Sequence, residues 1–157
     1  MKRRAITAFL VVGGLTAGLL AGCASGDKKM ASADPVADRQ QLMKKQGAAM
    51  QDITTKLRAG SLDGVAANAD VLVDTSKAIP GLFPAGSTSP KSRAKPEIWQ
   101  KKAEFDGYAR SLGEQATKVA GLARANNLPG TQAAVAEMGR TTCGACHNAF
   151  RGPEIKS

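Results

Sequence analysis

Residues 140–152 read RTTCGACHNAFRG, and they hold two of the three cysteines and the only histidine of the 157-residue chain. The spacing of Cys143, Cys146 and His147 is compatible with a zinc site, a redox-active thiol pair or haem attachment. A structural zinc site usually takes four protein ligands, one more than this stretch offers. A thioredoxin-like pair lies beside a strand–helix–strand unit, whose pattern is missing here. The order Cys-x-x-Cys-His is that of c-type haem attachment, with thioether bonds from both cysteines and axial iron binding by the histidine.

Upstream of this motif, apolar residues recur with the spacing of helices. Residues 35–59 form the first predicted helix, because a heptad repeat runs through Val36, Met43, Met50 and Leu57. Asp34 is suited to cap the start of this helix and Pro35 to occupy its first position, while Gly60 is a typical stop.

A second helix is predicted over residues 61–79. We expect Ser61 to cap its start and Pro80 to end it. Its apolar stripe has the alternating spacing of a bundle helix and comprises Leu62, Val65, Ala69, Leu72, Ser76 and Ile79.

Residues 80–96 contain four prolines and two glycines, which predicts a loop in which Leu82 and Phe83 turn inward. Two further helices are predicted over residues 97–126 and 131–150, separated by the sequence NNLPG. Their stripes comprise Ile98, Phe105, Ala109, Leu112, Ala116, Val119 and Ala123, and then Val135, Met138 and Thr142. No segment alternates polar and apolar residues, so strands are not predicted. The expected fold is an all-α, antiparallel four-helix bundle with covalently bound haem, spanning residues 34–157.

The N-terminal residues 1–22 have the basic start and short apolar run of a secretory signal. The run ends in Leu-Ala-Gly followed by Cys23, which resembles the lipobox of a lipoprotein-type signal peptide. A membrane-spanning anchor would need about 20 apolar residues, and this run is shorter and contains glycines. Ordinary signal cleavage after Ala33 is the alternative, although the polar sequence GDKK separates this cleavage site from the apolar run. We therefore expect an exported, periplasmic protein with peripheral membrane attachment through lipidated Cys23, followed by a flexible tether over residues 23–33.

The chain is basic, with a formal net charge of +9. Removal of Lys2, Arg3 and Arg4 with the signal leaves 19 basic and 13 acidic residues, a charge of +6. An exported protein rarely meets nucleic acid, so we expect no nucleic-acid partner. Acidic redox protein partners or anionic lipid are the predicted binding partners.

Several stretches together carry a family resemblance: DRQQLM at residues 38–43, IPGLFPAGS at 79–87, KPEIWQKKAEFD at 95–106 and CGACHNAFR at 143–151. With the haem motif near the C-terminus of a four-helix pattern, the chain resembles the class II cytochromes c, that is, cytochromes c' and their low-spin relatives. Arg151 matches a basic position common in that family. The resemblance implies one covalent haem c whose iron is bound by His147.

The resemblance also assigns the residue that faces the iron from the first helix, Met43. In low-spin cytochromes c-556 a methionine at this position binds the iron, whereas in high-spin cytochromes c' the position only screens an open site. The sequences LMKKQG and LFPAGS are closer to the c-556 type, which favours Met43 as second axial ligand and a one-electron carrier. The alternative is a high-spin protein that binds nitric oxide or carbon monoxide. Met50 and Met138 are expected to fill the core.

Arg39 and Gln40 match a pair that lies near the haem in the family, where the arginine contacts a propionate. The alternative for Arg39 is an exposed arginine at the start of the helix. The family often forms a homodimer through its first two helices, which we carry over as an expectation. No catalytic residue is predicted, because the only histidine is already assigned to the iron.

Overall fold

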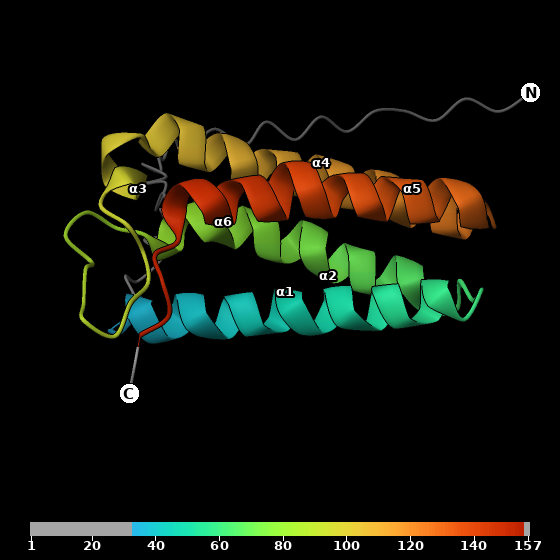
Figure 1. Ribbon diagram of the computed structural model, residues 1–157, viewed down its shortest axis with the longest axis horizontal. Helices are drawn as coiled ribbons and strands as arrows, with labels where there is room; N and C mark the ends of the chain where they lie inside the picture. The colour runs from blue at the N-terminus through green and yellow to red at the C-terminus, as the bar shows by residue number, and fades with distance from the viewer. Residues whose placement is uncertain (1–32, 156–157) are drawn as a thin grey trace, which may run out of the picture. The chain divides into compact units, whose positions relative to one another are not determined.

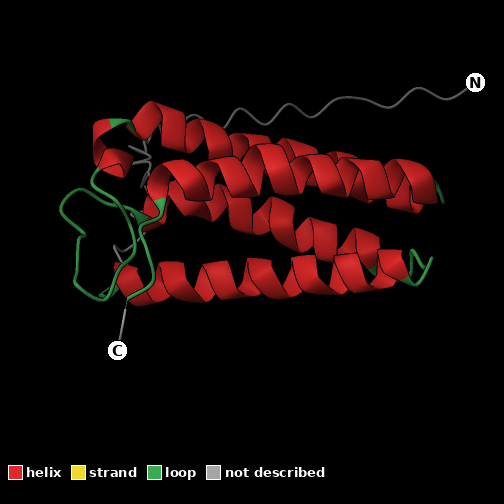
Figure 2. Ribbon diagram, viewed as in Figure 1, coloured by secondary structure: helices red, strands yellow, loops and turns green. Residues whose placement is uncertain are grey.

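The computed structural model describes residues 33–155, and these residues form the predicted all-α bundle (Figures 1 and 2). The long helices are α1 (Pro35–Arg58), α2 (Val65–Ala78), α4 (Lys102–Arg124) and α5 (Leu128–Met138). Four shorter elements complete it: η1 (Ile79–Leu82), α3 (Glu97–Gln100), the π-helical η2 (Gly139–Gly144) and α6 (Ala145–Phe150). In Figure 1, α1 and α4 run one way, and α2 and the continuous α5–η2–α6 run the other way.

Within residues 33–155 there is no β-strand beyond one isolated bridge between Ala94 and Arg151. None of the helices in this range combines the length and hydrophobicity of a bilayer-spanning segment. The predicted signal peptide, Cys23 and the tether up to residue 32 lie outside the described residues.

The first helix begins and ends close to its predicted limits. Asp34 Oδ1 accepts hydrogen bonds from the backbone N–H groups of Val36 (3.1 Å) and Ala37 (2.9 Å), and Pro35 occupies the first turn. These bonds satisfy N–H groups that have no partner within the helix. Gly60 follows the helix with a positive φ of 70°.

The second helix begins four residues later than predicted, at Val65. Its N-cap is Gly64, whose φ of 67° lies in the left-handed region that glycine adopts at little cost. The expected cap Ser61 is wrong, because its Oγ accepts instead from the N–H of Asp63 (3.1 Å) in the preceding turn. Leu62, expected in the helical stripe, packs half-buried against the core from that turn.

The third and fourth helices also differ from the prediction in detail. Residue Lys101, with φ −117° and ψ 44°, divides the third helix into α3 and α4. The fourth helix begins at Leu128 rather than at residue 131, because Asn127 Oδ1 accepts from the N–H of Gly130 (2.9 Å) and caps it. Asn126, with φ 56°, reverses the chain before that cap.

The π-helical segment η2 contains the first cysteine of the motif, Cys143, and ends two residues before the second, Cys146. A π-helical turn is rare and is frequent at functional sites. A Cβ atom at Gly144 would lie 3.1 Å from the carbonyl oxygen of Gly139, so the wide turn leaves little room for a side chain there. The turn buries Thr142, of which 2% is exposed, and carries Cys143 on the cavity side.

The core consists of small and aliphatic residues along the bundle and of aromatic residues at one end. Buried alanines such as Ala69, Ala116 and Ala120 allow close helix packing, with α2 and α4 in the most extensive contact. At the end near the 83–96 loop, four rings pack edge to face: Phe83, Phe105, Phe150 and Tyr108. Phe83 turns inward as predicted, and Leu82 is half-buried against the core.

Candidate haem-binding site

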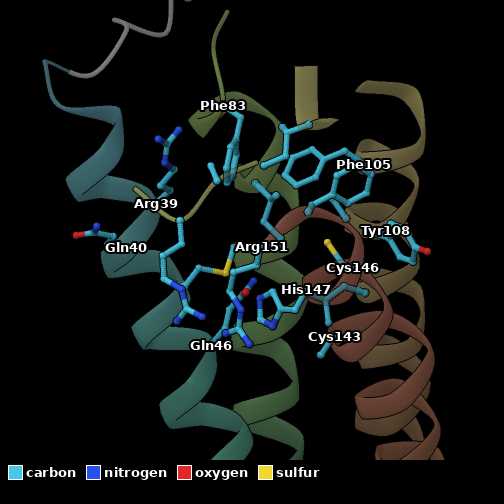
Figure 3. A pocket seen from close by; sticks show the side chains of 18 of the residues that line it. Arg39, Gln40, Gln46, Phe83, Phe105, Tyr108, Cys143, Cys146, His147 and Arg151 are labelled. Carbon is cyan, nitrogen blue, oxygen red and sulfur yellow. The ribbon is translucent and has the colours of Figure 1, made fainter. Parts of the chain in front are cut away.

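A cavity of about 420 Å³ opens at the aromatic end of the bundle (Figure 3). This volume is within the usual range for small-molecule and cofactor sites, about 300–1,000 Å³. Helix α1 forms one wall, and α6 with the end of η2 forms the opposite wall. The six predicted haem-binding residues that lie within residues 33–155 all line this cavity: Arg39, Gln40, Met43, Cys143, Cys146 and His147.

The two thiols of the motif are free and half-buried. Burial raises the pKa of Cys143, and burial together with the neighbouring Cys143 raises the pKa of Cys146 to about 11. Redox-active cysteines have lowered pKa values instead, so a dithiol redox centre does not fit. Nor do the described residues contain a cluster of three or more His, Cys, Asp or Glu side chains that could hold a bare metal ion. Of the chemistries that use this motif, haem attachment is the one that fits.

His147 projects from α6 into the cavity (Figure 3). Burial lowers the pKa of its imidazole, and the positive charges of Arg151 and Arg93 lower it further. The imidazole is therefore neutral at pH 7, the form that binds a metal.

The charged residues that line the cavity are all basic: Arg39, Lys44, Arg93 and Arg151. No carboxylate of the described chain lines it. The rest of the lining is largely apolar, including Ile79, Leu112 and the aromatic rings. An apolar cavity with basic residues and no acidic ones fits a planar hydrophobic cofactor with two carboxylates, which is what a haem is.

Arg39 is buried, with 4% of its surface exposed, so the alternative of an exposed arginine is wrong. Its guanidinium donates to Ser87 Oγ (3.1 Å), the Ser87 carbonyl (2.7 Å) and Ser92 Oγ (2.8 Å). It also lies 4.9 Å from the ring centroid of Phe83. Burial lowers the pKa of Arg39, and the charge of Asp34 opposes this shift. The guanidinium thus holds the 83–96 loop to α1 beside the cavity.

Gln40 makes a second link between α1 and this loop. Its Nε2 donates to the Lys91 carbonyl (2.8 Å), although the residue is exposed. On the other side, the same loop is bonded to the chain around α6. The N–H of Lys95 donates to the Phe150 carbonyl (3.0 Å), and the N–H of Gly152 donates to the Arg93 carbonyl (2.7 Å). The loop therefore joins both walls of the cavity.

Met43 lines the cavity from α1 and is half-buried. Met50, one heptad further along the helix, is half-buried against the core, and Met138 is fully buried. Among the methionines of residues 33–155, Met43 alone lines the cavity. The heptad repeat could not separate Met43 from Met50, because both lie on the same stripe.

Gln46 also lines the cavity, although it was not predicted from the sequence. It is buried, with 9% exposed, and its Nε2 donates to Thr75 Oγ1 on α2 (3.0 Å). The signal was present, since Gln46 lies three residues after Met43 and therefore on the same side of α1.

A family model described as "Cytochrome C'" matches residues 34–151. The chain is 34% identical over 125 residues to cytochrome c-556 from Agrobacterium tumefaciens, covering 76% of this chain and 98% of the relative. It is 30% identical over 128 residues to cytochrome c' from Rhodopseudomonas palustris, covering 78% and 84%. A nitric oxide complex of a mutant cytochrome c prime from Alcaligenes xylosoxidans superposes with a TM-score of 0.69 at 26% identity, covering 77% and 95%. With the motif, cavity and bundle in agreement, the chain belongs to the cytochrome c' family and binds covalent haem c.

Proposed function

We propose that the protein is a periplasmic one-electron carrier in which Cys143 and Cys146 hold the haem and His147 and Met43 bind its iron. The observation that carries the proposal is that Met43 and His147 line opposite walls of one cavity. The haem supplies reversible one-electron oxidation and reduction, and methionine–histidine ligation raises its potential. The 34% identity to a cytochrome c-556 over 98% of that relative supports the low-spin assignment.

The chain contributes three things to this function. The neutral imidazole of His147 and the thioether of Met43 supply one nitrogen and one sulfur ligand, a set typical of cytochromes c. The apolar lining excludes water from the iron. The basic residues Arg39, Lys44, Arg93 and Arg151 compensate the carboxylates of the cofactor.

A second candidate function is nitric oxide or carbon monoxide binding by a high-spin haem. It is favoured by the nitric oxide complex of the Alcaligenes xylosoxidans protein, whose fold this chain shares. In this reading Met43 only screens the sixth coordination position. The two functions differ in one bond, which can be tested directly.

The test compares Met43→Ala with Met50→Ala, a matched change one heptad along the same helix and outside the cavity. We expect the ferric wild-type protein to show a methionine-to-iron charge-transfer band at the red end of the visible spectrum. Met43→Ala should lose this band and bind carbon monoxide readily when reduced, whereas Met50→Ala should retain the wild-type spectrum. A high-spin ferric wild type that binds carbon monoxide when reduced would instead establish the second function.

Electron exchange is proposed to take place with acidic partners at the basic rim of the cavity. Lys44 and Arg151 are exposed there. Arg93 Nε donates to the backbone carbonyls of Gly152 (3.0 Å) and Pro153 (2.9 Å), and its guanidinium lies 4.0 Å from the Glu154 carboxylate. By contrast, Arg140 pairs with Glu137 and Lys102 pairs with Asp106, so these two basic residues are partly neutralised. Electron-transfer rates with an acidic partner should fall with rising ionic strength, since salt screens steering between exposed charges. A rate that rises with salt would contradict this docking surface.

Export and lipid attachment through Cys23 remain part of the proposal. If Cys23 is acylated, the wild-type protein should stay with membranes until detergent is added, and Cys23→Ser should be released by detergent-free lysis. Equal release of both proteins would contradict anchoring.

Homodimerisation through the first two helices is tested by the mass of the detergent-solubilised protein in sedimentation.

A further inference from the structure

A buried amide lies on the α1 wall of the haem cavity, in Gln46. The cavity walls there are otherwise formed mainly by apolar side chains such as Ile79 and Leu112. A buried amide is costly unless its polar atoms find partners. Figure 3 shows Gln46 on α1 and His147 on the opposite side of the same space.

The hydrogen bond between Gln46 and Thr75 fixes the orientation of the amide. Thr75 Oγ1 donates its proton to the Val71 carbonyl (2.7 Å), so its lone pair accepts from Gln46 Nε2 (3.0 Å). The amide nitrogen, Nε2, is therefore the atom that bonds to α2, and the amide oxygen, Oε1, does not take part in this bond. The chain of bonds anchors Gln46 to the backbone of α2 and holds its side chain in place.

The amide keeps one further N–H after this bond. A glutamine side chain has two N–H donors, and within residues 33–155 Gln46 makes the single bond to Thr75. Gln46 lies three residues after Met43 and, like it, lines the cavity, so both are on the side of α1 that faces His147. Since Gln46 lines the cavity, a group bound inside the cavity can accept a hydrogen bond from this N–H.

We propose that Gln46 is a positioning residue of the sixth coordination position, whose free amide N–H donates a hydrogen bond to the ligand bound opposite His147. The inference needs the haem and the His147 ligation, but it does not need Met43 to be an iron ligand. A donor fixed by Thr75 would stabilise a small ligand that gains negative charge on binding. Without this donor the ligand site would be purely apolar and would not favour such ligands.

The test uses carbon monoxide as the probe in a Met43→Ala background, where the probe meets no competition from the methionine. A donor near the probe's oxygen weakens its carbon–oxygen bond, so removing the donor should raise the stretching frequency. In Met43→Ala/Gln46→Leu we therefore expect a shift to higher frequency and release of carbon monoxide faster by about fivefold, the value of one ordinary hydrogen bond. Infrared spectroscopy and laser-flash kinetics measure the two effects.

Two further variants make the result specific. Gln51→Leu is the matched control, because Gln51 is an exposed glutamine on α1 outside the cavity, and it should leave both measurements unchanged. Thr75→Val retains the amide but removes its anchor, and it should broaden the stretching band. No upward shift in Gln46→Leu, or an equal shift in Gln51→Leu, would overturn the inference. A downward shift would also overturn it, because it would mean that the carbonyl oxygen of Gln46 faces the ligand.

Because Met43→Ala is present throughout, this experiment is independent of the proposed electron-carrier function. Loss of the charge-transfer band on mutation of Met43 tests that function, whereas the carbon monoxide measurements test Gln46. Either proposal can therefore fail without the other.

Discussion

Replacing Arg39 with methionine would remove a buried guanidinium while keeping most of the apolar stem of the side chain. The guanidinium donates three hydrogen bonds to Ser87 and Ser92, all between 2.7 and 3.1 Å. Bonds from a charged donor contribute about 1.5–3 kcal/mol each, but the serines lie in a partly exposed loop where water can replace the lost donor. We therefore take the neutral value of about 1 kcal/mol for each bond, or about 3 kcal/mol in all. Methionine retains contact with Phe83, which offsets the lost cation–π interaction of about 1 kcal/mol.

Urea unfolding of the haem-loaded protein, followed by circular dichroism, measures this loss. With a denaturant dependence of about 1–3 kcal/mol per molar urea, the midpoint should fall by about 1–3 M. The control is Arg58→Met, at the exposed far end of the same helix, which should change stability by no more than about 0.5 kcal/mol. If Arg39→Met is as stable as this control, the loop is not held by Arg39 and the reasoning is refuted. Arg39→Lys should be intermediate, since lysine keeps the charge without the forked donors.

Three further predictions concern the site and the helix that faces it. Gly144→Ala should lower the free energy of unfolding in urea by about 1–3 kcal/mol, because its Cβ would lie 3.1 Å from the Gly139 carbonyl oxygen. The control is Gly121→Ala on α4, where nothing lies within 4 Å of the new Cβ, and it should be neutral or stabilising. Equal effects of the two substitutions would contradict the steric argument. Asp34→Ala should lower stability by about 1 kcal/mol, because two N–H groups lose their cap, and an unchanged melting temperature would count against it. In the haem-free protein at pH 8, alkylation of Cys146 should be slower than in urea, because burial and Cys143 raise its pKa to about 11; equal rates would show that the thiol is not buried.

The sequence predicted those parts of the fold that depend on neighbouring residues. Asp34 and Pro35 lie next to each other and act within one turn, and α1 begins where they place it. The second helix was placed wrongly because Ser61 is a good cap in isolation. The left-handed conformation of Gly64 decides the true start, and a glycine in a helical pattern does not reveal its φ. The π-helical turn was missed because its residues fit an ordinary helical spacing equally well.

The haem-attachment residues could be predicted because they lie within one short sequence motif. Cys143, Cys146 and His147 are contiguous enough to be recognised. The resemblance predicted Met43 as an iron ligand, and the structure places Met43 in the lining of the same cavity. The burial of Arg39 could not be foreseen, because its partners Ser87 and Ser92 lie about 50 residues away in a loop without periodicity. Gln46 was missed for a similar reason, since a glutamine is normally taken as exposed and its partner Thr75 belongs to another helix.

Loops are commonly the places where proteins accept insertions, because few contacts fix their path. The loop between η1 and α3 differs, since α1 holds it at Ser87 and Lys91 and the segment around α6 holds it at Arg93 and Lys95. Backbone atoms of Ser87, Lys91, Arg93 and Lys95 make some of these bonds, and the side chains of Ser87, Ser92, Arg93 and Lys95 make others. An inserted residue would displace both sets of bonds at once, so the length of this loop is fixed by the distance it has to bridge between the two walls of the haem cavity.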